Sequence, residues 1–341
     1  MDVMRNRIRP ILDSLRQWRC RFSEELTEVE IRPGDYHFSE KLDADQLKDG
    51  WMSFGACETW GGRDRHFWFR TKVVIRKEWA GKEVRVTLNT GADDIWNTDN
   101  PQIMAYKNGI LSGTMDMNHQ DLILAEEAEE AEVFELVFYA YSNSENSTNF
   151  FHLKAAVYDR EIADLYYDLK VPFEAAELCF EEDLDRIEAM KFLNTAISGL
   201  DLRKPGSEEF YQSVREVREY VKKNLPDICR SSRVTVHSIG HTHIDVAWKW
   251  PLRQTRQKAV RSFQTVLNLM EQYPEYKFMS SQPQLYAFVK EEAPELFEKI
   301  KEKIHEGRWE AEGGMWLEPD CNLASGESLI RHILYGKRFF E

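Results

Sequence analysis

The segment from Val234 to Trp250 constrains the fold of this chain more than any other stretch. It reads VTVHSIGHTHIDVAWKW, in which a β-branched run ends at Gly240 and a polar cluster follows at once. β-Branched side chains favour strands, and Pro251 then opens a helical pattern at a position that suits proline. We therefore predict a strand that ends at Gly240, a short polar loop and a helix, which is the repeating unit of parallel α/β folds.

Three polar residues after Gly240 alternate along the chain: His241, His243 and Asp245. Because side chains in extended backbone repeat every two residues, these three are predicted to share one side. Two imidazoles and a carboxylate suit Zn²⁺ better than Mg²⁺ or Ca²⁺. α/β folds also keep their sites at the carboxyl ends of strands. A plainer interpretation stays open, since paired histidines often only hydrogen-bond in a core or lie on the surface.

Two motifs carry a resemblance to a known family. HTHIDVAWKW at 241–250 and GGMWLEPDCNLASGES at 313–328 occur in that order, each after a predicted strand. Together they resemble the start of the catalytic domain of glycoside hydrolase family 38, the α-mannosidases, and most closely its cytosolic and bacterial branch. The family often has proline where Ala324 stands, which bears on the stiffness of a loop and not on the metal-binding motif.

The resemblance implies roles for three residues. The family binds zinc through the second histidine and the aspartate of the first motif, here His243 and Asp245, while His241 matches a histidine that is not a ligand. A tryptophan three residues after the aspartate contacts the sugar in the family, and here that is Trp248, for which plain core packing is the alternative. Asp320 fits a pocket rim or a helix entry equally well, so no catalytic residue is assigned.

Composition excludes several classes of partner. A net charge of −14 over 341 residues argues against nucleic acids and anionic membranes, which attract basic patches. The first 18 residues are interrupted by charges, so they are interpreted as neither signal peptide nor membrane anchor.

The cysteines are odd in number and far apart, which indicates reduced thiols in a cytoplasmic protein. They are Cys20, Cys57, Cys179, Cys229 and Cys321. A homo-oligomer is compatible with these properties.

The first half of the chain divides into two parts. Residues 1–50 begin with apolar side chains at helical spacing, which predicts an amphipathic helix and arm that pack on a later domain. Residues 51–158 contain short strand-like runs, with Asn108-Gly109 as a favoured hairpin turn, and are predicted to form a β-sandwich. The predicted strands are Trp51–Phe54, His66–Ile75, Glu83–Leu88, Gln102–Tyr106, Leu122–Leu124, Val133–Tyr141 and Phe150–Val157.

The β-rich part also carries a resemblance. Its run WGGRDRHFWFR, followed by a KNG turn, is similar to the jelly-roll domain that precedes many glycosidase barrels. Such sandwiches can bind sugars, but aromatic residues more often fill their cores. We therefore expect core positions for three tryptophans of this part, which are Trp60, Trp68 and Trp96.

The second half of the chain changes from helices to alternating elements. Residues 159–232 are predicted to form a helical linker region without visible chemistry. Residues 233–341 alternate strands at 234–239, 276–280 and 309–316 with helices, which predicts a parallel sheet with right-handed crossovers. The predicted fold class is therefore multi-domain α+β: a jelly-roll β-sandwich, a helical linker and the first three βα units of a (β/α) barrel.

The resemblance implies a retaining, exo-acting α-mannosidase that binds one zinc ion, or another divalent metal, and acts on an oligosaccharide or mannoside. The family's nucleophile and general acid lie beyond the matched motifs, so the chain is interpreted as an N-terminal piece that is inactive alone. Two alternatives stay open. One is a metal hydrolase of the amidohydrolase type, and the other is a non-catalytic carbohydrate-binding protein. Val246 argues against metallo-β-lactamase-like enzymes, which have histidine there.

Overall fold

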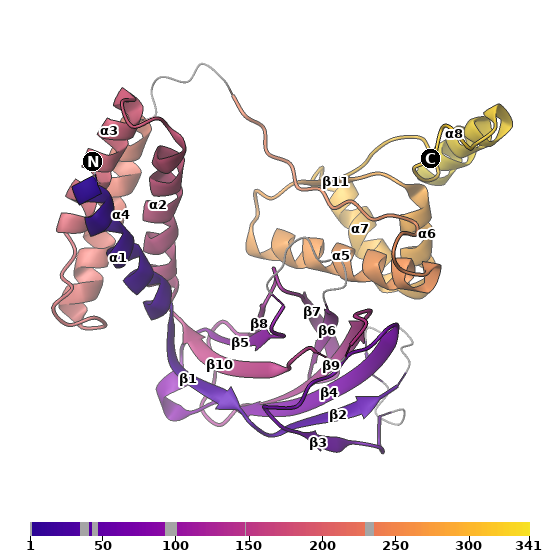
Figure 1. Ribbon diagram of the computed structural model, residues 1–341, viewed down its shortest axis with the longest axis horizontal. Coiled ribbons are helices and arrows are strands. Elements are labelled where there is room, and N and C mark those ends of the chain that lie inside the picture. The colour runs from indigo at the N-terminus through magenta and orange to yellow at the C-terminus, as the bar shows by residue number, and fades with distance from the viewer. Residues whose placement is uncertain (1, 35–40, 43–46, 93–100, 147, 229–234) are drawn as a thin grey trace.

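The computed structural model describes residues 2–34, 41–42, 47–92, 101–146, 148–228 and 235–341. A group of helices stands over one end of a pair of sheets, and a second group of helices with a short parallel sheet lies over the other end (Figure 1). No helix in these ranges is long and apolar enough to cross a membrane. The organisation is α+β with several parts, as the sequence predicts.

Two antiparallel sheets form the middle of the molecule. One has the strand order β1-β10-β5-β8 and the other the order β3-β2-β4-β9-β6-β7. Apolar side chains from both sheets meet in one core, where Phe69 stacks on Phe151 with ring centroids 3.8 Å apart. The elements are β1 Cys20–Leu26, β2 Val29–Pro33, β3 Met52–Phe54, β4 Arg65–Val74, η1 Lys77–Trp79, β5 Val84–Asn89, β6 Gln102–Lys107, β7 Ile110–Met115, β8 Asp121–Ala125, β9 Val133–Ser142 and β10 His152–Tyr158.

All seven strands predicted in this part are present, within two residues at each end. Asn108 and Gly109 connect β6 to β7 with φ angles of 52° and 79°, as a tight hairpin turn requires. The structure has three further strands that the sequence does not predict: β1, β2 and β7. Two of them, β1 and β2, lie before residue 51, where the predicted sandwich begins. β1 is an edge strand with no fully buried residue, so its sequence CRFSEEL lacks the apolar alternation that marks a strand.

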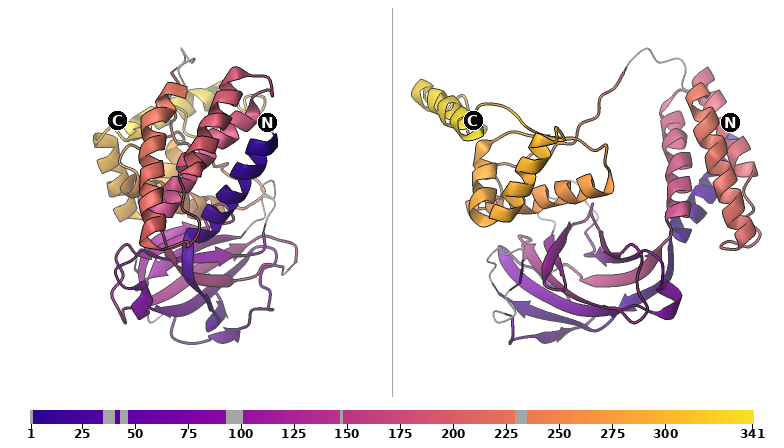
Figure 2. Two further views of the ribbon diagram at one scale, coloured as in Figure 1. Left: turned by 90° about the vertical axis from the view of Figure 1, so that its left-hand side faces the viewer. Right: turned by 180° about the vertical axis from the view of Figure 1, so that it is seen from behind.

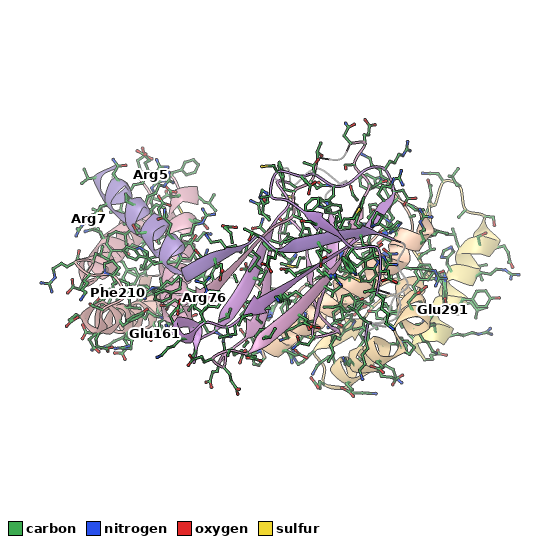
Figure 3. The ribbon with its side chains drawn as sticks, turned by 90° about the horizontal axis from the view of Figure 1, so that it is seen from below. Arg5, Arg7, Arg76, Glu161, Phe210 and Glu291 are labelled. Atoms are coloured by element: carbon green, nitrogen blue, oxygen red, sulfur yellow. The ribbon has the colours of Figure 1, made fainter. Side chains whose placement is uncertain are left out.

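The helical part has a core of its own. It consists of α1 Asp2–Trp18, α2 Arg160–Leu178, α3 Leu184–Ser198 and α4 Glu208–Ile228. Asp159 caps α2 by accepting a hydrogen bond of 3.1 Å from the Ile162 amide. Figure 3 shows Phe210 of α4 in the same group of helices as Arg7 of α1, which donates a 2.9 Å hydrogen bond to Asn194 of α3. The first helix thus packs on later segments, as predicted.

The last part of the chain alternates helices with two short parallel strands. Its elements are α5 Leu252–Gln272, β11 Phe278–Ser280, α6 Pro283–Glu292, α7 Pro294–His305, β12 Trp309–Ala311 and α8 Gly326–Phe340. β11 and β12 pair in parallel, as predicted. α5 lies over the outer face of the six-stranded sheet, which the view from behind also shows (Figure 2). Phe263 of α5 belongs to the same buried cluster as Trp68 and Tyr139 of that sheet.

The strand predicted at 234–239 is wrong for the residues that the structure describes. Residues 235–239 have no regular secondary structure, and only Gly240 forms a bridge, to Phe278 of β11. A parallel strand gains its stability from burial on both faces, whereas Val236 and Ile239 are 78% and 55% exposed. Val234 lies outside the described residues. The strand predicted at 309–316 also ends early, at Ala311, before the glycine pair Gly313 and Gly314.

The expected place in the core of the sandwich is confirmed for Trp60 and wrong for Trp68, which is buried but outside that core. Trp60 lies between the two sheets. Trp68 faces the other way and packs in the cluster beneath α5, because it alternates with Phe69 along β4. Trp96 lies outside the described residues.

Candidate functional site

The loop at 241–250 begins where Gly240 joins the parallel pair. The Gly240 amide donates to the Lys277 carbonyl at 2.8 Å, and the Gly240 carbonyl accepts from the Met279 amide at 2.9 Å. A Cβ at this position would lie 2.0 Å from the Tyr276 hydroxyl oxygen. A larger residue at position 240 would therefore have to displace the Tyr276 ring, which fits the close approach that glycine permits.

Two buried polar side chains hold the backbone of the loop. Gln282 donates from Nε2 to the Ile244 carbonyl at 3.2 Å, and Thr255 donates from Oγ1 to the Asp245 carbonyl at 3.4 Å. Both residues are buried, and Gln282 has a left-handed backbone with φ of 67°. Backbone strain of this kind collects at functional sites. The contacts orient the loop so that Ile244 enters the core while His243 and Asp245 stay accessible.

His243 lies between two carboxylates. Its Nε2 is 3.3 Å from Oδ1 of Asp245, and its Nδ1 is 3.6 Å from Oε1 of Glu318. About half of the His243 side chain is exposed, as is about 40% of Asp245. The structure thus brings together the two residues to which the resemblance assigns zinc binding, and adds a third group, Glu318, that the sequence analysis did not single out.

The other two residues considered at this motif lie differently. His241 is exposed and forms no hydrogen bond or ion pair with His243 or Asp245. Asp320 belongs to a turn, where its Oδ1 accepts a 2.8 Å hydrogen bond from the Asn322 amide. Asp320 thus stabilises a turn ahead of α8, whose own N-cap is Ser325.

Trp248 is available for contact with a ligand. It is 55% exposed, so it does not fill a core. Its ring meets that of Trp250 edge-on, with centroids 5.8 Å apart, and the Trp250 indole donates to Thr255 at 3.1 Å. The Lys258 ammonium lies 4.1 Å from the Trp250 ring centroid, and burial lowers the pKa of Lys258 to about 7. The Lys249 ammonium lies 5.1 Å from the Trp248 ring centroid, but Trp248 has no hydrogen bond like that of Trp250, so Trp250 is the anchored member of the pair and Trp248 the more exposed one.

The donor set fits a zinc ion in part. Two ligands of a tetrahedral zinc, each at about 2.0–2.1 Å, lie roughly 3.3 Å apart, which matches the separation of His243 Nε2 and Asp245 Oδ1. Among the residues that the structure describes, no three His, Cys, Asp or Glu side chains form a ready metal cluster. A catalytic zinc site uses three protein ligands, so the pair His243 and Asp245 would be one ligand short of such a site.

These features define the class of protein. It is an α+β chain in which a histidine–carboxylate pair lies in the loop before α5, and α5 is followed by two parallel strands with helices between them. Residues 233–341 match the model of the glycosyl hydrolases family 38 N-terminal domain. Residues 233–341 therefore carry the N-terminal domain of this family, and the resemblance of the two motifs, which both lie in this range, is confirmed.

Relatives extend the similarity upstream of this domain. Alpha-mannosidase G of Dictyostelium discoideum is 30% identical over 335 residues, covering 94% of this chain and 30% of that protein. The alpha-mannosidase of Saccharomyces cerevisiae is 30% identical over 297 residues, covering 80% of this chain and 27% of that protein. The chain thus spans less than a third of the length of these relatives. A solved structure of Bacteroides uniformis beta-glucuronidase shares 12% identity and a TM-score of 0.28, over 39% of this chain and 18% of that one.

Sequence reasoning missed the residues that support the site. Thr255 and Gln282 act through side-chain contacts with backbone carbonyls, and neither contact leaves a mark in the sequence. Glu318 lies within the GGMWLEPD run, but only its position beside His243 distinguishes it from the other acidic residues nearby.

Proposed function

We propose that the protein carrying this chain is a retaining α-mannosidase that hydrolyses terminal α-linked mannose in oligosaccharides or simpler mannosides. The observation that carries the proposal is the meeting of His243 and Asp245 within the family 38 domain, at a separation suited to one metal ion. The names of the relatives, all alpha-mannosidases, support the substrate class.

A bound zinc ion would supply a Lewis acid that orients sugar hydroxyl groups and stabilises a distorted ring. His243 would contribute a directional nitrogen and Asp245 a charge that offsets part of the metal's. Trp248 would offer its exposed indole to the apolar face of the sugar ring. Retention requires two further carboxyl groups about 5–5.5 Å apart across the sugar, and we assign neither to the described residues.

The architecture belongs to the same proposal. The two stacked sheets would be an accessory domain of the jelly-roll type over residues 51–158 together with β1 and β2. Residues 233–341 would begin a (β/α) barrel, a proposal supported by the parallel pair β11–β12 with helices between its strands. Residues 159–232 would connect the two. A cytoplasmic location is supported by the free thiols of Cys20, Cys57, Cys179 and Cys321.

The test uses the full-length protein with an aryl α-mannoside and elemental analysis. We expect about one zinc per chain, lost together with turnover in His243→Ala and in Asp245→Ala, because each removes one of three ligands. His241→Ala should keep at least part of its metal. Equal loss of metal from all three variants would overturn the ligand assignment. The 341-residue chain alone, with two donors, should bind zinc weakly and show no turnover.

A further inference from the structure

We propose that Glu318 is a positioning residue for the metal site. Its carboxylate would accept a hydrogen bond from Nδ1 of His243. The other ring nitrogen, Nε2, would then face the metal ion that His243 and Asp245 bind together. The inference rests on the proposed function, because it presupposes that His243 is a ligand. It adds a residue that neither the sequence motifs nor the comparisons assign.

The geometry around the His243 ring carries the first part of the argument. The two ring nitrogens face different carboxylates: Nε2 is near Asp245 and Nδ1 is near Glu318. One imidazole nitrogen can bind a metal only if it carries no proton, and the other nitrogen then carries the hydrogen. A carboxylate beside Nδ1 stabilises the hydrogen there, which leaves the Nε2 lone pair for the metal.

The second part is that the segment before Glu318 is held in place. The Trp316 carbonyl accepts from the Gln284 amide at 3.0 Å, and the Trp316 indole donates to Oε1 of Gln284 at 2.9 Å. The Trp316 amide donates to the His332 carbonyl of α8 at 2.9 Å. Glu318 therefore follows a fixed point, although it is 75 residues from His243 in the sequence.

The same helix start holds both loops. Gln282, just before α6, binds the Ile244 carbonyl next to His243, and Gln284, in the first turn of α6, binds Trp316. A single short segment thus sets how far the two loops lie apart. The Nδ1–Oε1 distance of 3.6 Å is longer than a hydrogen bond. Glu318 would therefore have to move closer to make the bond, and because its side chain is 60% exposed, no packed element holds it back.

The decisive measurement is the zinc dissociation constant of the full-length protein, obtained by competition with a chromophoric chelator. Carboxylates that orient a ligating histidine typically contribute 10–100-fold to metal affinity, so Glu318→Ala should bind zinc about 10–100-fold more weakly. Glu318→Gln should fall between parent and Glu318→Ala, since an amide oxygen still accepts the hydrogen bond but carries no charge. Melting temperatures should stay unchanged, because the side chain is exposed.

Asp320→Asn is the matched control. It removes a negative charge two residues away, while the amide oxygen can still cap the turn at Asn322, so its zinc affinity should stay within about twofold of the parent. A second measurement uses the cobalt(II)-loaded protein and proton NMR. The exchangeable Nδ1–H signal of His243 should be visible in the parent and should exchange faster with solvent in Glu318→Ala.

The outcomes separate this inference from the proposed function. If Glu318→Ala keeps the parent affinity while His243→Ala loses it, His243 is a ligand and Glu318 does not position it. If Glu318→Ala and Asp320→Asn weaken zinc binding equally, the loss of affinity comes from the removal of a negative charge near the site, and the positioning role of Glu318 is wrong. If His243→Ala itself keeps the parent affinity, the ligand assignment fails and this inference falls with it.

Discussion

Trp248 and Trp250 show how two identical residues in one loop come to differ. Trp250 is held by a hydrogen bond to Thr255 and by the Lys258 ammonium 4.1 Å from its ring centroid. Trp248 has ring contacts with Trp250 and with the more distant Lys249 ammonium, at 5.1 Å, and is 55% exposed. An exposed indole in the same loop as a histidine–carboxylate pair suits contact with the apolar face of a sugar. Its contribution should therefore appear in substrate binding and not in stability.

We expect Trp248→Ala in the full-length protein to lower kcat/KM for an aryl α-mannoside roughly tenfold, the loss of about 1–2 kcal/mol of apolar contact. The free energy of unfolding should change by no more than about 0.5 kcal/mol, as for other exposed positions. Trp60→Ala is the control, since Trp60 is buried between the sheets and its loss should act on stability. Unfolding shifts of equal size in both variants would contradict the role given to Trp248.

The turn between β7 and β8 is an element that is stabilised by charge. Oδ1 of Asp116 accepts hydrogen bonds of 2.8 Å from the Asn118 and His119 amides and lies 3.2 Å from Nδ1 of His119. Burial raises the pKa of Asp116, but the hydrogen bond and charge of His119 and the charge of Arg261 outweigh burial and lower this pKa to about 2. The hydrogen bond to Asp116 raises the pKa of His119.

These shifts predict how stability depends on pH. The pKa of Asp116 is lower in the folded than in the unfolded state. Its contribution to the free energy of unfolding is therefore complete above the ordinary pKa of 3.8 and is lost as the pH falls through about 2. The His119 pKa is raised, so its contribution is complete below 6.5 and is lost as the pH rises through its folded value.

Asp116→Asn should therefore lower the free energy of unfolding most between about pH 4 and 6.5. The expected loss is about 1–2 kcal/mol, after allowance for solvent screening at this partly exposed site. Urea unfolding of parent and variant from pH 2 to 8 provides the measurement. The two stability curves should converge at the acid end. A difference that stays constant down to pH 2 would contradict the pairing of Asp116 with His119.

In the whole molecule, the stacked sheets support the candidate site through α5. Tyr139 of β9 donates to Gln257 of α5 at 3.0 Å, and Asn143, after β9, donates to the Lys249 carbonyl in the site loop at 3.1 Å. Arg253 at the start of α5 pairs with Asp64, just before β4. The sheets therefore contact both the loop that carries Trp248 and the helix that follows it.

Trp68 lies at the centre of this contact, 5% exposed and with its ring centroid 5.3 Å from that of Tyr139. Trp68→Ala should lower the free energy of unfolding by roughly 3–5 kcal/mol, as other truncations of large buried aromatic side chains do. Urea unfolding measures the cost, and binding of a mannoside in the full-length protein is followed in parallel. A variant that unfolds like the parent and loses only sugar binding would show that Trp68 serves a ligand and not the packing of α5.

Local patterns predicted the elements whose signal is carried by neighbouring residues. Alternation marked seven strands of the sheets, and helical spacing marked α5 and α8. β1 escaped because an edge strand needs no buried face, and the strand expected at 235–239 is absent because its β-branched residues lack burial. The same limit applies at the site: the sequence indicated His243, Asp245 and Trp248, but not Thr255, Gln282 or Glu318.

The sequence by itself determined the family, the α+β composition and the motif that alternates Ile244 with His243 and Asp245, since each depends on residues close together in the chain. The tertiary structure alone decided that α5 covers Trp68 on the outer face of a sheet and that Glu318 faces His243. Contacts of this kind join segments far apart in sequence, and their distances are set by the packing of α6 and the side-chain hydrogen bonds of Gln282 and Gln284 at its start. No local pattern encodes such a distance, because it depends on the packing of all the elements between the two residues.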